Sequence, residues 1–224
     1  MNGYYLRFAL AWLVSAGLGC TSAPVRYYTL TPPPDKTLPA AETTLAIDVR
    51  VVHTPPQLSR SELMVRTGPT EVTLLENERW ASPVNDEIKD AVRLELQRRL
   101  GRVTGLHPGF TLTLDIDVQH LEAEFGRYAL LDAYWSGTLS ASGKTSRGAR
   151  ATICAFQASE KIHTGYAEMV EGYQRAIAAL ADAIVAALTS PANGIDALCP
   201  REVVRTTTRP LSLVFCSIAP QPQT

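Results

Sequence analysis

Residues 110–118 carry the strongest strand signal in the chain. They read Phe-Thr-Leu-Thr-Leu-Asp-Ile-Asp-Val, with apolar and polar side chains at alternate positions. Successive side chains of a β-strand point to opposite faces of a sheet, so this alternation predicts one face against a core and the other in water. A chain with this strand must build a sheet and cover one side of it with other elements.

Other segments have the alternation or the β-branched and aromatic composition of strands. Gly68 and Pro69 separate two of these segments, which predicts a hairpin. The predicted strands, besides 110–118, are 45–52, 62–67, 70–76, 128–141 and 150–158.

Two helices are expected between these strands. The first has Ser82 as its N-cap and Pro83 at its first position, and it ends after Arg98 and Arg99. The second, 166–188, repeats apolar side chains at spacings of three and four residues and is rich in alanine. Such a slim helix can pack closely on a sheet or on a neighbouring subunit, and packing on the sheet is the expected use.

The order of elements over residues 45–188 is strands, helix, strands, helix. This order predicts the α+β class, as a single two-layer domain with a mainly antiparallel sheet and two principal helices. Residues 189–224 are rich in proline and threonine, and we expect an irregular C-terminal tail there.

Residues 1–19 have the features of a bacterial secretion signal. Arg7 precedes an apolar run, 8–18, which has the length of a signal-peptide core and is too short to span a membrane as a helix. The residues up to Cys20 resemble a lipobox, although Gly17 stands where leucine is usual. We therefore predict that Cys20 is acylated and anchors the mature protein, while an ordinary signal peptide with an incidental cysteine is the alternative. Thr21, where enterobacterial retention uses aspartate, favours the outer membrane.

Residues 20–44 are expected to form a proline-rich tether with a short strand inside it. Alternation sends Tyr28 and Leu30 to one face of this strand and Tyr27 to the other. We expect the strand to join the domain's own sheet, which keeps the body within about 20 Å of the anchor. The alternative is a free strand that pairs with a partner protein, on a tether of up to about 75 Å.

Three cysteines remain after Cys20. Cys154 lies in an apolar strand-like stretch and is interpreted as a small buried hydrophobe. Cys199 and Cys216 could close a disulfide loop, and an unpaired arrangement is an equal alternative.

For each candidate catalytic or metal-binding motif in the sequence, an ordinary structural role is the better explanation. The segment from Gly137 to Thr145 has the wrong glycine spacing for a phosphate-binding loop, and Asp115 and Asp117 fit a solvated sheet face better than acid–base catalysis. The four histidines form no zinc-binding unit. A formal net charge of −1 gives no case for nucleic acid as a partner. We therefore expect no enzyme, no cofactor and no metal, and a function in binding, tethering or assembly.

Several stretches in order resemble the ABC-type transport auxiliary lipoproteins that accompany MCE-domain lipid transporters. The resemblance rests on Arg26-Tyr-Tyr-Thr-Leu30, on Met64-Val-Arg66-Thr-Gly68 and on Arg79-Trp80-Ala-Ser-Pro83 at the entry to the first helix. It also covers the strand 110–118 and the closing alanine-rich helix. The chain departs from the family pattern after Thr189.

The resemblance implies a noncatalytic lipoprotein on the periplasmic face of the outer membrane. Its partners would be an MCE-domain protein and inner-membrane ABC or permease components that move lipids, and it would dock or seal the outer end of the system as a possible homo-oligomer. The residues expected to have interaction or docking roles are Tyr27, Tyr28, Leu30, Arg66 and Trp80. The alternatives are an envelope assembly lipoprotein that binds a β-barrel or peptidoglycan, and a lipid-carrying pocket inside the domain.

Overall fold

The computed structural model describes residues 23–33, 46–100, 110–141, 153–189 and 213–217. In chain order, the elements are β1 (Arg26–Tyr28), β2 (Ala46–His53), the short 3-10 helix η1 (Pro56–Leu58), β3 (Glu62–Arg66), β4 (Val72–Trp80), α2 (Val84–Leu100), β5 (Phe110–Glu124), β6 (Tyr128–Ala141), β7 (Ile153–Lys161), α3 (Tyr166–Thr189) and β8 (Leu213–Ser217). The α+β class predicted from the sequence is confirmed.

The described strands form two sheets, and each of them is mixed. The larger sheet has the order β2-β5-β6-β7-β8, in which β2 is parallel to β5 and the other pairs are antiparallel. The smaller sheet has the order β1-β4-β3, with β1 parallel to β4. The described strand pairs are mainly antiparallel, as predicted, but the strands form two sheets instead of one and each sheet contains a parallel pair. Between β2 and β5 the chain passes through η1, β3, β4 and α2, and such a long crossover is what a parallel pair requires.

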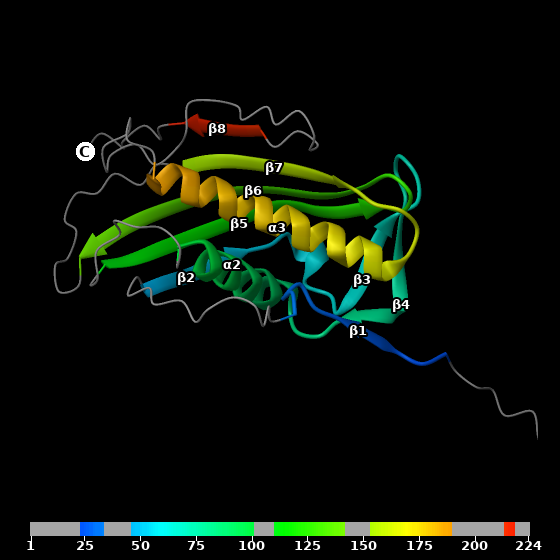
Figure 1. The fold of residues 1–224 in the computed structure, drawn as a ribbon. Coiled ribbons are helices and arrows are strands. Elements are labelled where there is room, and N and C mark those ends of the chain that lie inside the picture. Colours follow the sequence, from blue (N-terminus) through cyan, green and yellow to red (C-terminus); the bar gives the residue numbers. More distant parts are fainter. Residues whose placement is uncertain (1–22, 34–45, 101–109, 142–152, 190–212, 218–224) are drawn as a thin grey trace, which may run out of the picture.

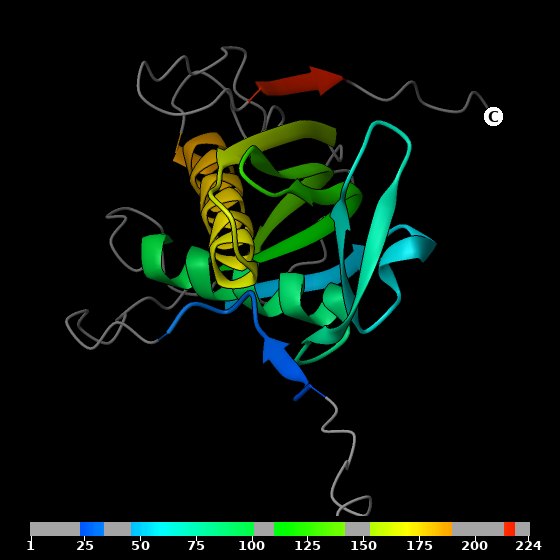
Figure 2. The ribbon, with the colours of Figure 1, turned by 90° about the vertical axis from the view of Figure 1, so that its right-hand side faces the viewer.

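The two α-helices cover one face of the larger sheet (Figures 1 and 2). Helix α3 packs on β6 and β7, and α2 packs on β2 and against α3. The β3–β4 hairpin lies on the other side of the sheet from the helices (Figure 2). The helix-covered face of β5 supplies the centre of the core with Leu112, Leu114, Ile116 and Val118, each at most 1% exposed. The alternation of residues 110–118 therefore places the apolar side chains as predicted.

Strand β5 continues to Glu124, six residues beyond the predicted end. Its pairing with β6 shifts between Val118 and His120. Such an irregularity breaks the period of two, because an extra residue is inserted before the next inward side chain. Leu121 and Ala123 are then buried in their turn.

The C-terminal region contributes a strand that was not predicted. Residues 213–217 form β8, which pairs antiparallel with the edge of β7. This strand is only five residues long and depends on pairing with β7, about 60 positions earlier in the chain, so a local pattern could not identify it.

Helix α3 lies close to the sheet at Gly172. A Cβ atom added there would lie 2.6 Å from Cγ2 of Ile162 and 2.8 Å from Cβ of Ala129. We expect Gly172→Ala to lower the free energy of unfolding by about 1–3 kcal/mol, because helix and sheet would have to separate. Chemical denaturation measures this. Gly68→Ala is the matched control, since its added Cβ would meet nothing closer than 3.7 Å. Equal stability of Gly172→Ala and the parent chain would contradict close packing.

Candidate docking site of the N-terminal segment

The strand β1 pairs with the domain's own β4, as the self-docking interpretation expects. In the parallel register, Tyr28 lies opposite Trp80, and the amide of Ala81 donates to the Tyr28 carbonyl over 2.8 Å. Leu30 is fully buried, Tyr28 is half-buried and Tyr27 is 66% exposed. The segment is therefore packed into the domain through Tyr28 and Leu30, while Tyr27 remains at the surface.

The carboxylate of Glu87 holds the residues that follow β1. It accepts hydrogen bonds from the Thr29 hydroxyl at 2.7 Å and from the Leu30 amide at 2.8 Å. The Ser82 hydroxyl, predicted to cap α2, donates to the same carboxylate at 2.7 Å. Glu87 lies in the first turn of α2, where the helix dipole also favours a negative charge.

Helix α3 contributes a second contact to the same residues. The Gln174 side-chain amide donates to the Thr29 carbonyl at 3.1 Å. Helices α2 and α3 therefore both bind the segment that follows β1, and the buried Leu30 lies between these polar contacts. We call Glu87, Gln174 and the Thr29–Leu30 segment the clamp.

A partly buried ion pair fixes β1 itself. Arg26 donates to Glu78 of β4, with Nε 3.0 Å from Oε1, and Glu78 is only 5% exposed. The Arg26 guanidinium also lies 5.4 Å from the ring centroid of Tyr166. Burial raises the pKa of Glu78, but the hydrogen bond from Arg26, the neighbouring Tyr28 hydroxyl and the Arg26 charge outweigh it, so its pKa is below the ordinary value.

We expect acid to loosen β1. Because the pKa of Glu78 is lower in the folded protein, its contribution to stability is complete above the ordinary carboxyl pKa and is lost as the pH falls through the folded-state value. Hydrogen exchange of amides 26–30, corrected for intrinsic rates, should therefore show protection that falls at low pH.

Glu78→Gln should remove this pH dependence. Glu122→Gln is the matched control, because the pKa of Glu122 is also lowered, by Arg66 and Tyr128 against the opposing effect of burial. An acid transition at residues 26–30 that persists in Glu78→Gln would show that another group is responsible.

Trp80 closes β4 beside this segment. Its side chain is 7% exposed, and its ring centroid lies 6.2 Å from that of Tyr173 in α3. The tryptophan thus connects the smaller sheet to the helix layer at the point where β1 docks.

Arg66 belongs to a separate cluster that joins the two sheets. Its guanidinium donates to Glu122 of β5 at 2.6 Å, and the Tyr128 hydroxyl donates to the other carboxylate oxygen at 2.9 Å. Arg66 also donates to the Gly68 and Pro69 carbonyls, at 3.4 and 3.2 Å. In the structure, then, this arginine fixes the β3–β4 hairpin to the larger sheet. It also lines a cavity of about 260 Å³ between β3, η1 and β5.

Comparison with known proteins agrees with this arrangement. A family model described as "ABC-type transport auxiliary lipoprotein component" matches residues 28–185, which begins at the docked Tyr28 and ends within α3. The chain belongs to this family. Among solved structures, an uncharacterised protein is 18% identical, with a TM-score of 0.54, over 75% of this chain and 100% of that chain.

A second solved structure, of a protein from Xanthomonas campestris, is 16% identical with a TM-score of 0.45 over 71% of this chain and 90% of that chain. No curated protein matches the sequence. At this identity, the first structure supports the fold of the auxiliary lipoprotein and nothing about its ligands.

The structure brings together four of the predicted residues, Tyr27, Tyr28, Leu30 and Trp80, but not Arg66. Cys20 and Cys199 lie outside the described residues. The clamp residues Glu87 and Gln174 were not predicted from the sequence. An acidic residue in the first turn of a helix is already explained by the helix dipole, and nothing local connects Gln174 to a residue 145 positions earlier.

The state of Cys154 differs in part from the prediction. The residue is fully buried, as expected of a small hydrophobe, but it is disulfide-bonded. The possible Cys199–Cys216 disulfide, one of two equal alternatives from the sequence, is not tested directly, because Cys199 lies outside the described part of the chain.

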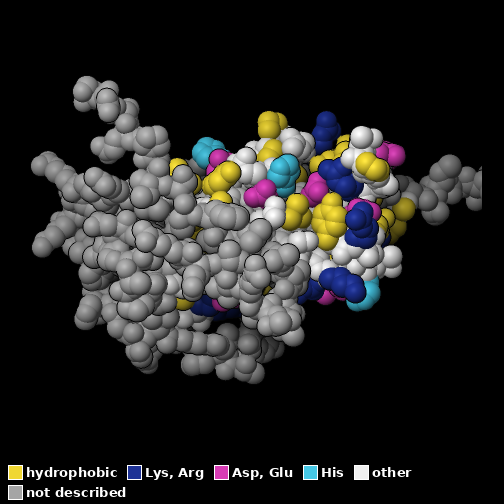
Figure 3. All heavy atoms as spheres, turned by 90° about the horizontal axis from the view of Figure 1, so that it is seen from above, with side chains coloured by type: hydrophobic (Ala, Val, Ile, Leu, Met, Phe, Trp, Pro, Cys, Tyr) yellow, Lys and Arg dark blue, Asp and Glu magenta, His cyan; other side chains and the backbone are white. Residues whose placement is uncertain are grey.

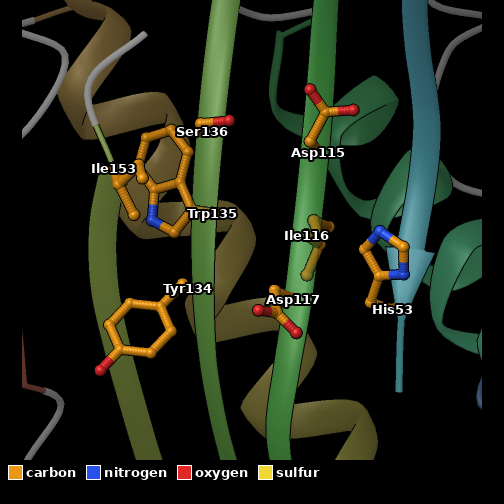
Figure 4. A pocket seen from close by; sticks show the side chains of 8 residues that line it. All are labelled: His53, Asp115, Ile116, Asp117, Tyr134, Trp135, Ser136 and Ile153. Carbon is orange, nitrogen blue, oxygen red and sulfur yellow. The ribbon is translucent and has the colours of Figure 1, made fainter. Parts of the chain in front are cut away.

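The helix-free face of the larger sheet has an open cavity of about 380 Å³ (Figure 4). His53 comes from β2, Asp115 and Asp117 from β5, and Tyr134 and Ser136 from β6. Asp115 forms an ion pair with Arg50 over 2.5 Å, with both side chains partly exposed. This arrangement is that of a solvated sheet face with an exposed tyrosine.

Within the described ranges, no group of three or more His, Cys, Asp or Glu side chains could hold a metal ion. No helix there is both long and apolar enough to cross a membrane. Seen from above, the described surface intersperses basic, acidic and apolar side chains (Figure 3). This view shows no patch of one charge for a nucleic acid or a charged ligand.

Proposed function

We propose that this auxiliary lipoprotein is a noncatalytic component of an MCE-type lipid transport system, anchored by an acylated Cys20 to the periplasmic face of the outer membrane. It would bind the MCE-domain protein at the outer end of the system and so support outer-membrane integrity. The membership in the auxiliary lipoprotein family supports the transport context.

The docked N-terminal segment is the observation that carries the proposal. Cys20 precedes Arg26 by six residues, and Arg26 is already paired with the body of the domain. Six extended residues span about 20 Å at most. A cysteine acylated at position 20 would therefore hold the domain at the membrane surface, where a docking component is needed, rather than on a long free tether.

Copurification tests the partner. The full chain, tagged at its C-terminus and extracted from membranes with detergent, is expected to retain an MCE-domain protein together with the permease and ATPase components. A chain that instead retains a β-barrel protein or peptidoglycan would overturn the proposal in favour of envelope assembly. Light scattering of the purified chain tests the proposed homo-oligomer separately.

A matched pair of variants connects this test to the docked segment. Leu30→Asp should undock the buried residue and reduce recovery of the partner, because the body would no longer be held near the anchor. Tyr27→Asp changes an exposed side chain on the same strand and should leave the clamp formed. Hydrogen exchange shows whether the segment is undocked in Leu30→Asp. If it is undocked and the partner is still fully recovered, the docked segment is not needed for partner binding.

A further inference from the structure

Cys154 joins the sheet covalently to another part of the chain. It is 0% exposed in β7 and is disulfide-bonded. The chain has three other cysteines, Cys20, Cys199 and Cys216. The identity of the partner therefore determines which segment is fixed to the core.

The strand register identifies the partner. In the antiparallel pair of β7 and β8, Cys216 lies directly opposite Cys154. Residues directly opposite each other in such a pair have Cα atoms about 4.5–5.5 Å apart and side chains on the same face. Disulfides usually join Cα atoms about 4.4–6.8 Å apart. Cys20 precedes β1, which lies on the other side of the molecule from β8 in both views (Figures 1 and 2).

We propose that Cys154 and Cys216 form an intramolecular disulfide that fixes the C-terminal region to the sheet. The two thiols lose two protons and two electrons as the S–S bond forms, and a disulfide oxidant is reduced to two thiols in exchange. This pairing leaves Cys199 as a thiol and excludes the Cys199–Cys216 pair, which the sequence offered as one of two equal alternatives.

The bond has a consequence for the shape of the protein. The family match ends at residue 185, so β8 lies in the part of the chain beyond the shared domain. The disulfide makes this additional part a permanent edge strand. Strand β8 then occupies the edge of β7, so that a partner cannot add a strand there, and β2 is the strand at the opposite edge of the larger sheet.

Trypsin separates the three cysteines cleanly. Cleavage after arginine and lysine leaves Cys154 in 151–161 and Cys199 in 176–201, while Cys216 lies in 206–224 because the Arg209–Pro210 bond resists trypsin. The full chain is purified without reductant, its free thiols are alkylated, and the digest is analysed by mass spectrometry without reduction. A parallel sample is first equilibrated in a glutathione redox buffer, which makes the result independent of where the cell places the protein.

We expect peptide 151–161 linked to 206–224, with 176–201 alkylated, and a monomer on a non-reducing gel. A link from 176–201 to either of the other peptides, a covalent dimer, or alkylation of all three cysteines in both samples would overturn the proposal.

Variants give a second readout. Cys154→Ser and Cys216→Ser should each lower the urea midpoint and abolish its sensitivity to reductant, and the double variant should behave like the single ones. Cys199→Ser is the matched control and should keep both the midpoint and the reductant sensitivity. A Cys199→Ser variant that loses its reductant sensitivity would contradict the pairing, whatever the stability of the other variants.

Discussion

Trp80→Ala is expected to lower the free energy of unfolding by about 3–5 kcal/mol. The side chain is 7% exposed and lies against Tyr173, so its removal leaves a large cavity between the smaller sheet and α3. The cavity would also lie directly beside Tyr28, its register partner in β1. We therefore expect faster hydrogen exchange at residues 26–30 as well as a lower urea midpoint.

Tyr27→Ala is the control for this prediction. It removes an aromatic side chain from the same pair of strands, but one that is 66% exposed, and should change stability by less than about 0.5 kcal/mol. If Trp80→Ala unfolded at the same urea concentration as the parent chain, Trp80 would have to act as a partner contact instead of a packing residue.

Cys20→Ser is expected to abolish membrane anchoring completely. Without the thiol no acyl chain can be attached, and the protein should move from the membrane fraction to the soluble fraction. Metabolic labelling with a fatty acid should give no labelled protein. Circular dichroism should be unchanged, because the residue precedes the docked segment.

Cys199→Ser controls for the loss of a cysteine as such and should keep both the label and the membrane fraction. Label that persists in Cys20→Ser would mean that the lipid is attached elsewhere. Unlabelled parent protein would mean that residues 1–19 act as an ordinary signal peptide.

The positions of strands and helices could be predicted from the sequence wherever the spacing of apolar side chains followed a single period, of two residues for a strand or three to four for a helix. Strand β6 has the expected bounds, and α3 and α2 differ from the prediction by only a residue or two. The prediction ended too early at β5, because the irregularity near Val118 interrupts the period of two. The parallel pairs β1–β4 and β2–β5 depend on crossovers through most of the N-terminal half, which no local pattern encodes.

The docking of Tyr28 and Leu30 could be predicted because a short strand with alternating exposure is stable only inside a sheet. The residues that hold it could not. Glu87 meets Thr29 across 58 positions of sequence. The position of its carboxylate at a helix N-terminus is already explained by the helix dipole. The sequence therefore gives no sign that the same carboxylate also binds the N-terminal segment.

The clamp has a mechanical consequence. In the proposed arrangement, with Cys20 in the membrane and a partner bound to the domain, a force that separates the two would enter the protein at its N-terminus. It would first act on the β1–β4 pair and on the hydrogen bonds of Glu87 and Gln174. These few bonds can open locally while the two helices and the larger sheet remain folded. Release of the segment would add the chain between Arg26 and Ala46 to the length that separates the anchor from the domain. The attachment would therefore lengthen under tension and shorten again when β1 pairs with β4.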